Sequence, residues 1–375
     1  MPEGCHASPV LQDNIGSIFL GGLLLIWARR RRRKKKIFKT FEEQIEGLKR
    51  KNLKFRNEKF ALNTLKRVNY YSLINAYKEN FLDPNYKKIS PDDSDEMYKE
   101  NTFFENLFWL YYFDSEMRSN LLKYIFIAES NIKTKLAYYF CEKYKTVNNA
   151  YVKKNNFEYT SCSGLIEDIN RLVQKLKRTI RKQSNIQGSR INHYTTNYNT
   201  VPLWVLMPQL DFGTTAYFFK CSQKDIQSKI AKDMKFEFIE KNSEFNNEYI
   251  FTGEALSNII FFVNSFRNIC AHNERLYDHR FTTNNIDNFI VHEHYRLNFN
   301  YGLFDLILVL KFFISPLEYD ALITLLASSL GFLHNNVEKN DFIKILNKMK
   351  FPRNWEEILE IKEKFQRMKE FYKNQ

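Results

Sequence analysis

The stretch SFRNICAHNER, residues 265–275, decides how this sequence is interpreted, because it lies in an apolar, helix-like run that begins near Ala255. Apolar residues at helical spacing predict one buried face: Phe262, Phe266, Ile269 and Leu276. Polar residues at +4, +3, +4 spacing predict a second face: Asn268, His272, Arg275 and His279. Arg267 lies about 100° from Asn268 around the axis, so a cation, an amide and an imidazole face one region.

Two interpretations of this helix stay open from spacing alone. The first, which spacing favours, is a surface helix whose histidine is satisfied by its neighbours. The second is a site that acts on a phosphodiester. Histidine has a pKa of about 6.5 and so transfers protons near neutral pH. An arginine guanidinium can hold two phosphate oxygens at once.

The composition favours an all-α protein with a polyanionic partner. Only 11 glycines and 8 prolines occur in 375 residues, and long segments carry helical periodicity. One large helical unit or two lobes are therefore expected. The formal net charge of +14 favours nucleic acid or an anionic membrane surface. Five scattered cysteines without a Cys-x-x-Cys pair indicate neither a disulfide framework nor a zinc site, which fits a reducing, intracellular setting.

No cofactor or metal is predicted. The glycines never fall in a G-x-G-x-x-G, G-x-x-x-x-G-K or G-x-S-x-G pattern, which disfavours nucleotide-dependent enzymes and α/β-hydrolases. The dense His/Glu cluster at residues 292–294 is a weak metal motif, because alternate residues of a helix point apart.

The first 36 residues differ from the rest of the chain. An uncharged, mostly apolar run of fourteen residues over 15–28 is followed by eight basic residues over 29–36. That run is shorter than the roughly 20 residues of a spanning helix, and a signal peptide carries its basic residues before its apolar part. We favour a dispensable tail over 1–36 and one helical domain over 37–375. An anchor that contacts the inner membrane from the cytoplasmic side stays the alternative.

Periodicity and capping signals divide the rest of the chain into elements. A capping box over residues 40–43 marks the first helix start. Helices are expected over 57–80, 162–183, 253–276, 301–313 and 317–332, with a charged terminal helix that ends near residue 373. The aromatic-rich segment 102–145 is expected to form two helices broken near Asp114. The polar segment 183–200 is expected to be an exposed loop.

The predicted helix over 162–183 carries two stripes. Its apolar stripe consists of Leu165, Ile169, Leu172 and Leu176. Its basic stripe consists of Arg171, Lys175, Arg178 and Lys182. A solvated helix face is the favoured interpretation of the basic stripe. Contact with the phosphate backbone of a nucleic acid is the alternative.

The order of several short segments resembles the Abi-like family, the abortive-infection proteins of bacteria. These segments are KTFEEQI at 39–45, LKRVNYY at 65–71, PLWV at 202–205 with FG at 212–213, RNICAHNERL at 267–276 and FPRNW at 351–355. The resemblance covers about residues 38–356, and residues 1–36 have no counterpart in it. Each segment is moderately specific, and their common order strengthens the match.

The resemblance implies an all-helical fold with a HEPN-like bundle core and additional N-terminal and C-terminal helices. The hallmark of that domain is an Arg, a polar residue and then a His at Arg-x4–6-His spacing, which Arg267, Asn268 and His272 match. The resemblance further implies a metal-independent endoribonuclease of a toxin or phage-defence system, with a cleft made of two such motifs. Since this chain has one motif, a homodimer is expected to supply the second.

The residue types fit cleavage of RNA by its own 2′-hydroxyl. His272 would act as base or acid, and Arg267 would neutralise the charge of the pentacoordinate phosphorus. Asn268 would orient the imidazole or contact the phosphate. The expected products are a 2′,3′-cyclic phosphate and a 5′-hydroxyl. Arg275, His279 and the basic stripe are the further candidates for RNA contact.

The leading hypothesis is therefore a cytoplasmic, RNA-cleaving defence protein that forms a homodimer. One alternative is a HEPN protein that binds RNA or regulates without cutting it. The other is a membrane-associated interaction protein whose functional part is the segment 15–36. No segment of the sequence identifies a phage trigger or an antitoxin.

Overall fold

The structure is a computed structural model. It describes residues 37–374 except 89, 91–93, 146, 159–160, 247, 283–285 and 287–288. The apolar and basic segment 15–36 lies outside these residues. In the described part all the elements are helices, apart from two isolated bridges, so the all-α prediction is confirmed. No helix among them is both long and apolar enough to cross a membrane.

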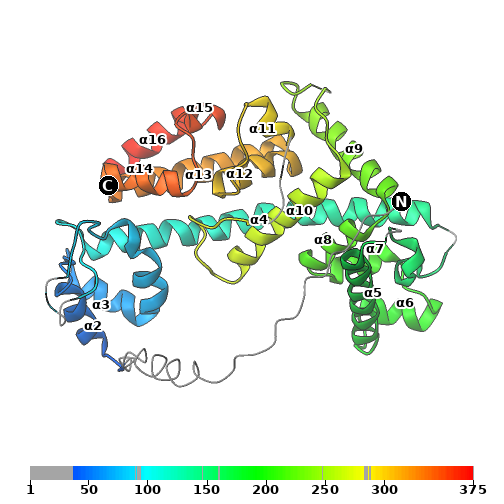
Figure 1. Ribbon diagram of the computed structural model, residues 1–375, viewed down its shortest axis with the longest axis horizontal. Coiled ribbons are helices and arrows are strands. Elements are labelled where there is room, and N and C mark those ends of the chain that lie inside the picture. Colours follow the sequence, from blue (N-terminus) through cyan, green and yellow to red (C-terminus); the bar gives the residue numbers. More distant parts are fainter. Residues whose placement is uncertain are drawn as a thin grey trace, which may run out of the picture.

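One long helix, α4 (Phe104–Lys143), crosses the whole molecule (Figure 1). Its 40 residues correspond to about 60 Å at 1.5 Å per residue. The other helices pack along it in three groups. The sequence predicted two helices here with a break near Asp114, which is wrong. Asp114 is buried and pairs with Arg118 one turn later, so its charge is satisfied inside a continuous helix.

The first group lies at the N-terminal end of α4 and is coloured blue in Figure 1. It consists of α2 (Phe41–Lys49), α3 (Glu58–Arg67), the π-helical turn η1 (Tyr71–Asn75) and the 3-10 turn η2 (Lys78–Asn80). The predicted capping box is confirmed: Glu43 N–H donates to Thr40 Oγ1 at 3.2 Å, and Thr40 N–H donates to Glu43 Oε2 at 2.8 Å. A single helix over 57–80 was wrong, because Val68 adopts an extended conformation with φ −117° and ψ 127°.

The second group gathers around the C-terminal end of α4, at the right of Figure 1. It consists of the turns η3 (Ala150–Val152), η4 (Lys154–Asn156) and η5 (Met207–Gln209), with α5 (Ser163–Ser184), α6 (Arg190–Tyr198), α7 (Leu203–Leu206), α8 (Phe212–Cys221) and α9 (Lys224–Lys241). The predicted loop over 183–200 is wrong, because α6 lies there. Ser189 caps that helix by accepting a bond from Asn192 N–H at 3.0 Å, and Ile191 is buried.

The third group contains the remaining helices. It consists of α10 (Gly253–Ala271), α11 (Ile290–His294), α12 (Leu303–Phe313), α13 (Pro316–Asn336), α14 (Lys339–Lys348), α15 (Trp355–Ile358) and α16 (Lys362–Lys373). Of these helices, α10, α12 and α13 contact α4, and α13 packs against both α4 and α16. The expected helices at 301–313 and 317–332 therefore exist, with α13 starting at a Pro after the Ser315 cap.

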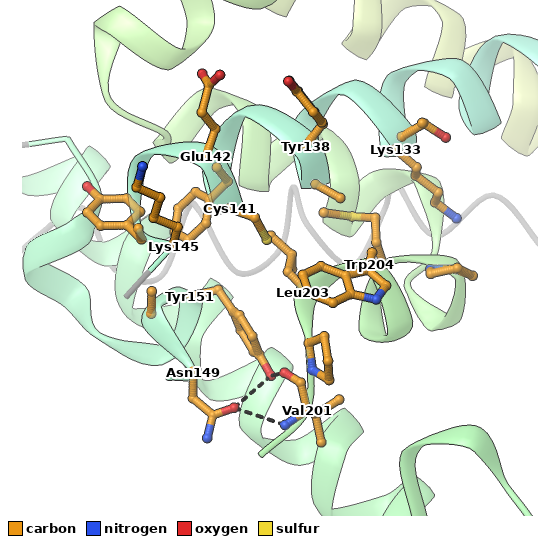
Figure 2. Close-up of a pocket in the computed structure, with 18 of the residues that line it drawn as sticks. Lys133, Tyr138, Cys141, Glu142, Lys145, Asn149, Tyr151, Val201, Leu203 and Trp204 are labelled. Atoms are coloured by element: carbon orange, nitrogen blue, oxygen red, sulfur yellow. Dashed lines mark hydrogen bonds between the residues drawn. The ribbon is translucent and has the colours of Figure 1, made fainter. Parts of the chain in front are cut away.

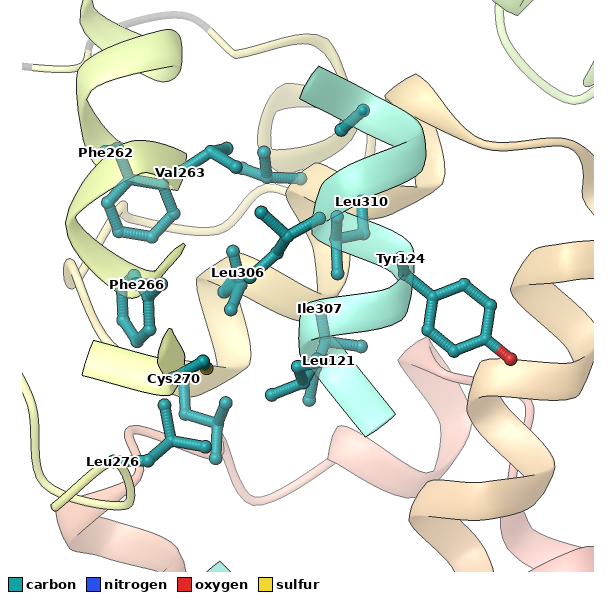
Figure 3. Packing of buried hydrophobic residues seen from close by; sticks show 14 of the residues in the cluster. Leu121, Tyr124, Phe262, Val263, Phe266, Cys270, Leu276, Leu306, Ile307 and Leu310 are labelled. Carbon is teal, nitrogen blue, oxygen red and sulfur yellow. The ribbon is translucent and has the colours of Figure 1, made fainter. Parts of the chain in front are cut away.

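The core around residues 265–275 is formed by α4, α10 and α12, which Figure 3 shows from close by. α10 contributes Phe262 and Phe266, both 0% exposed, and Leu276 beyond its end is 0% exposed as well. Leu306 of α12 and Leu121 of α4 face them. The predicted apolar face is thus confirmed for these three residues. Full burial of such side chains contributes about 1.5–3 kcal/mol each, which holds α10 against α4.

Candidate active site at the end of helix α10

Helix α10 ends at Ala271, not near Leu276 as the sequence predicted. Asn273 adopts a left-handed conformation with φ 57°, and Glu274 N–H donates to Ile269 O at 3.0 Å. This six-to-one bond is the Schellman pattern of helix termination. Asn268 and His272 therefore share a helical face, whereas Arg275 and His279 lie beyond the helix, so the predicted four-residue polar face is wrong.

The three motif residues lie together at this helix end. Arg267 Nη1 donates to Asn268 Oδ1 at 3.4 Å. Arg267 Nε is buried and has no partner among the described residues. His272 is the C-cap residue, and its N–H donates to Asn268 O at 2.9 Å. Its imidazole is exposed and makes no hydrogen bond within the described part of the chain, so it can engage a ligand.

A buried carboxylate fixes the chain that leaves the motif. Asp114 of α4 is 0% exposed and accepts bonds from Leu276 N–H at 3.0 Å and Tyr277 N–H at 2.7 Å. Tyr77 donates its hydroxyl to the same carboxylate at 2.6 Å. Arg118 pairs with Asp114 and also donates to the backbone carbonyl of residue 274 at 3.2 Å. The segment after His272 is thereby held against α4.

This buried cluster was not predicted from the sequence. One signal was present: Asp114 and Arg118 stand four residues apart within a segment that is otherwise rich in aromatic and aliphatic residues. Two buried charges are costly to desolvate unless they pair, so such a spacing in an apolar helix indicates a buried ion pair. Which backbone amides it holds could not be read from the sequence.

Arg275 and His279 are already engaged by the protein. Arg275 donates to the carbonyl of Ala76 in the first group of helices and pairs with Asp278 at 2.8 Å. His279 Nε2 lies 3.4 Å from Ser265 Oγ, and its ring packs edge to face on Phe266. Burial and the neighbouring Arg280 lower the pKa of His279. Their contact with RNA stays a prediction.

The predicted basic stripe lies on the exposed side of α5. Arg171 pairs with Glu167 at 2.8 Å within the helix, and Lys175 pairs with Asp211 at 2.7 Å. Arg178 and Lys182 are exposed and form no ion pair with a residue that the structure describes. Their contact with RNA stays a prediction too, although these two cations remain available to an anion.

Helix α8 connects the stripe to the motif. It packs on both α5 and α10. Its cap residue Asp211, which holds Lys175, accepts a bond from Thr214 N–H at 2.7 Å. A Cβ placed on Gly213 would lie 3.7 Å from Asn264 Nδ2, and Asn264 precedes Asn268 by one turn of α10. The N-terminus of α8 thus lies between α5 and the motif face.

Two other chemistries find little support near the motif. Burial raises the pKa of the Cys270 thiol to about 12, so it is a poor nucleophile. Within the described ranges, no three His, Cys, Asp or Glu side chains come together as a metal site. In the 292–294 cluster, His292 is buried and its Nε2 lies 2.9 Å from Asp305 Oδ1.

A large cavity of about 1090 Å³ lies away from the motif, between the C-terminal half of α4 and the segments 147–151 and 200–208. Figure 2 shows Tyr138, Cys141 and Trp204 around it. Its wall is tied together where Tyr151 donates its hydroxyl to Val201 O at 2.6 Å. Burial raises the pKa of the Cys141 thiol, so this thiol is not activated as a nucleophile.

The fold and the site define an all-helical protein with an Arg-Asn-x3-His motif at a helix end, in which Asn268 and His272 are exposed and Arg267 is half-buried. The model of the family described as Abi-like protein matches residues 63–278, which is more than half of the chain and includes the whole motif. The chain belongs to this Abi-like family, and membership indicates a role in abortive infection. No curated protein and no solved structure matches the chain.

Proposed function

We propose that this protein is a metal-independent endoribonuclease of an abortive-infection system. The observation that carries the proposal is the imidazole of His272, in a chain of the Abi-like family. It is exposed, makes no hydrogen bond to a residue that the structure describes, and belongs to the same helix end as the Arg267–Asn268 pair. Helix α8 packs on both α5 and α10, and the exposed cations Arg178 and Lys182 of α5 favour a polyanion as the ligand. A base, a cation and an amide then face the same phosphate.

In the proposed reaction, the 2′-oxygen of a ribose attacks the adjacent phosphorus and the 5′-oxygen of the next nucleotide leaves. His272 removes the 2′-hydroxyl proton. Arg267 donates to the phosphate oxygens and stabilises the dianionic pentacoordinate state. Asn268 holds the Arg267 guanidinium and contacts the phosphate. A proton delivered to the 5′-oxygen completes the step and leaves a 2′,3′-cyclic phosphate and a 5′-hydroxyl.

The acid that protonates the leaving oxygen must stand on the opposite side of the phosphorus from the base. On one chain the nearest second histidine after the motif, His279, is packed between Ser265 and Phe266 and is poorly placed for that role. We propose that His272 of a second copy supplies the acid, so that the active form is a homodimer with a two-fold composite site.

The test is incubation of the purified full chain with RNA in the presence of EDTA, with mapping of the new ends. We expect 2′,3′-cyclic phosphate ends from the parent and none from His272→Ala or Arg267→Ala. His193→Ala is the matched control, because His193 is also an exposed helical histidine, and it should keep cutting. A thermal unfolding midpoint equal to that of the parent shows that each variant is folded.

Two results would contradict the proposal. Equal cleavage by His272→Ala and the parent would remove the assigned catalytic role. RNA binding without any cleavage by the parent would favour a regulatory RNA-binding protein instead. The dimer is tested separately by light scattering and by dilution, since specific activity should fall as the chain dissociates. Activity proportional to concentration in a proven monomer would refute the composite site.

A further inference from the structure

A pair of aromatic rings lies on the outer surface where α8 packs against α10. The rings of Tyr217 and Phe261 meet edge to face with 5.2 Å between their centroids. Tyr217 is 42% exposed, while Phe261 is half-buried against the core. The Tyr217 ring therefore remains accessible to a planar partner, and Phe261 supports it from below.

This pair faces the same side as the motif. Phe261 precedes Asn268 by seven residues, which is two helical turns, so both lie on one face of α10 about 10 Å apart along its axis. α8 runs alongside in the opposite direction: its Gly213 lies against Asn264, and Tyr217, one turn later, meets Phe261. Figure 1 shows α8 and α10 side by side, with α5 next to them.

One lysine lies over the Tyr217 ring, and a second lies near the start of the same helix. Lys220 Nζ lies 5.6 Å from the centre of the Tyr217 ring and pairs with Asp168 of α5 at 2.8 Å. Lys175 of α5 pairs with Asp211 at the α8 N-terminus. Both lysines are exposed. Since both lysines are already paired with aspartates, a phosphate would have to replace Asp168 or Asp211 as their partner. The exposed ring beside Lys220 matches the flat base of a single-stranded nucleic acid.

We propose that Tyr217 and Phe261 form a base-stacking subsite, so that this face takes single-stranded RNA. The inference rests on the proposed function and narrows its substrate class. In a duplex the faces of the bases are already covered by their neighbours, whereas an unpaired base can leave its stack and lie on a protein ring. A base held on Tyr217 would guide its strand along α10 toward Arg267 and Asn268.

The experiment measures binding, not cleavage, and uses the full chain carrying His272→Ala so that bound RNA stays intact. The probes are a labelled single-stranded oligoribonucleotide and a blunt duplex of the same sequence, followed by fluorescence anisotropy. We expect Tyr217→Leu to weaken single-strand binding by about fivefold to one-hundredfold, the range of one base–aromatic stack. Tyr217→Phe keeps the ring and should bind as tightly as its parent.

Two controls separate stacking from folding and from charge. Phe236→Leu is the matched variant, since Phe236 is 45% exposed and has Lys232 Nζ at 5.7 Å from its ring, but it lies on α9. It should bind like the parent. Between about 50 and 200 mM salt, the loss caused by Tyr217→Leu should stay constant, whereas Lys182→Ala should reduce the salt dependence itself.

The subsite is refuted if Tyr217→Leu binds the single strand as tightly as its parent, if the duplex binds better than the single strand, or if the single strand does not bind. The first two results leave cleavage by the unsubstituted chain untouched. Conversely, single-strand binding that depends on Tyr217 in a chain that never cuts RNA would end the proposed catalysis and keep the subsite.

Discussion

Replacement of Arg118 by Met tests whether the buried pair on α4 holds the segment that follows the motif. Arg118 is 3% exposed and its partner Asp114 is 0% exposed. Methionine keeps most of the length of the buried side chain and removes the charge. The substitution therefore leaves the Asp114 carboxylate with three donors, the Tyr77 hydroxyl and the amides of Leu276 and Tyr277.

The expected cost follows from what remains buried. Removal of one partner of a buried ion pair costs about 3–5 kcal/mol, because the other charge stays desolvated. That is a large part of the roughly 5–15 kcal/mol that stabilises a folded domain. The variant should therefore still fold, but unfold at a lower urea concentration than the parent. Tyr77→Phe removes only one bond to the carboxylate and should cost about 1.5–3 kcal/mol.

A double substitution separates the ion pair from the amides. Asp114→Leu with Arg118→Met removes both charges, and a plain buried ion pair is often replaced in this way without loss. Here the Tyr77 hydroxyl and the N–H groups of Leu276 and Tyr277 would lose their acceptor, at about 1–3 kcal/mol each. We therefore expect the double variant to remain less stable than the parent by about 3–9 kcal/mol.

Urea unfolding followed by circular dichroism gives the free energy of unfolding of each variant, provided that its slope against urea concentration is unchanged. Hydrogen exchange read by mass spectrometry gives the location, because peptides that cover residues 272–280 should exchange faster while peptides of α5 should not. A loss below about 1 kcal/mol in Arg118→Met would show that the pair does not stabilise the fold. A loss of about 3–5 kcal/mol without faster hydrogen exchange over residues 272–280 would show that the ion pair does not hold this segment.

Three further predictions concern single side chains. Burial lowers the pKa of His279 below 6.5, so the unfolded chain binds the proton more readily than the folded chain. The free energy of unfolding therefore falls as pH drops below about 6.5. His279→Gln should make this fall smaller when urea unfolding is measured across the same pH range. Thr40→Ala removes the cap bond to Glu43 N–H and should cost about 1 kcal/mol by thermal unfolding, with Thr40→Ser as the neutral control. Gly331→Ala would place a Cβ 2.8 Å from Met368 Cβ and should cost about 1–3 kcal/mol; an unchanged melting temperature would refute the close contact of α13 with α16.

Periodicity alone was enough for most helices, and two of its failures involve the same buried pair. The helix expected through Leu276 ends at Ala271, and the break expected at Asp114 does not exist. The Asp114–Arg118 pair satisfies its own charges inside α4. Its carboxylate also holds two amides more than 160 residues away along the chain, just beyond the Schellman turn that ends α10. A contact of that separation leaves no local pattern in the sequence.

The candidate site, like the fold, could be predicted from the sequence only in part. The spacing of Arg267, Asn268 and His272 was visible in the sequence because they share one helix. The approach of α8 to that helix was not, since Gly213 and Asn264 are brought together only by the fold. α6 was missed for a simpler reason: its composition is polar and only one of its residues, Ile191, is buried, so it shows hardly any apolar period.

In the proposed mechanism, RNA and a second copy must share one end of α10. If a strand crosses Tyr217 and Phe261 on its way to Asn268, that face of α8 and α10 is covered by RNA and cannot also be the protein contact. A second copy that brings its own His272 to the same phosphate must then approach from beyond the helix end. A helix continued through residue 276 would obstruct that approach, whereas the turn fixed by Asp114 leaves His272 exposed at a tip held against α4. In such a dimer, the buried carboxylate of Asp114 would hold the segment that follows each His272 against its own α4.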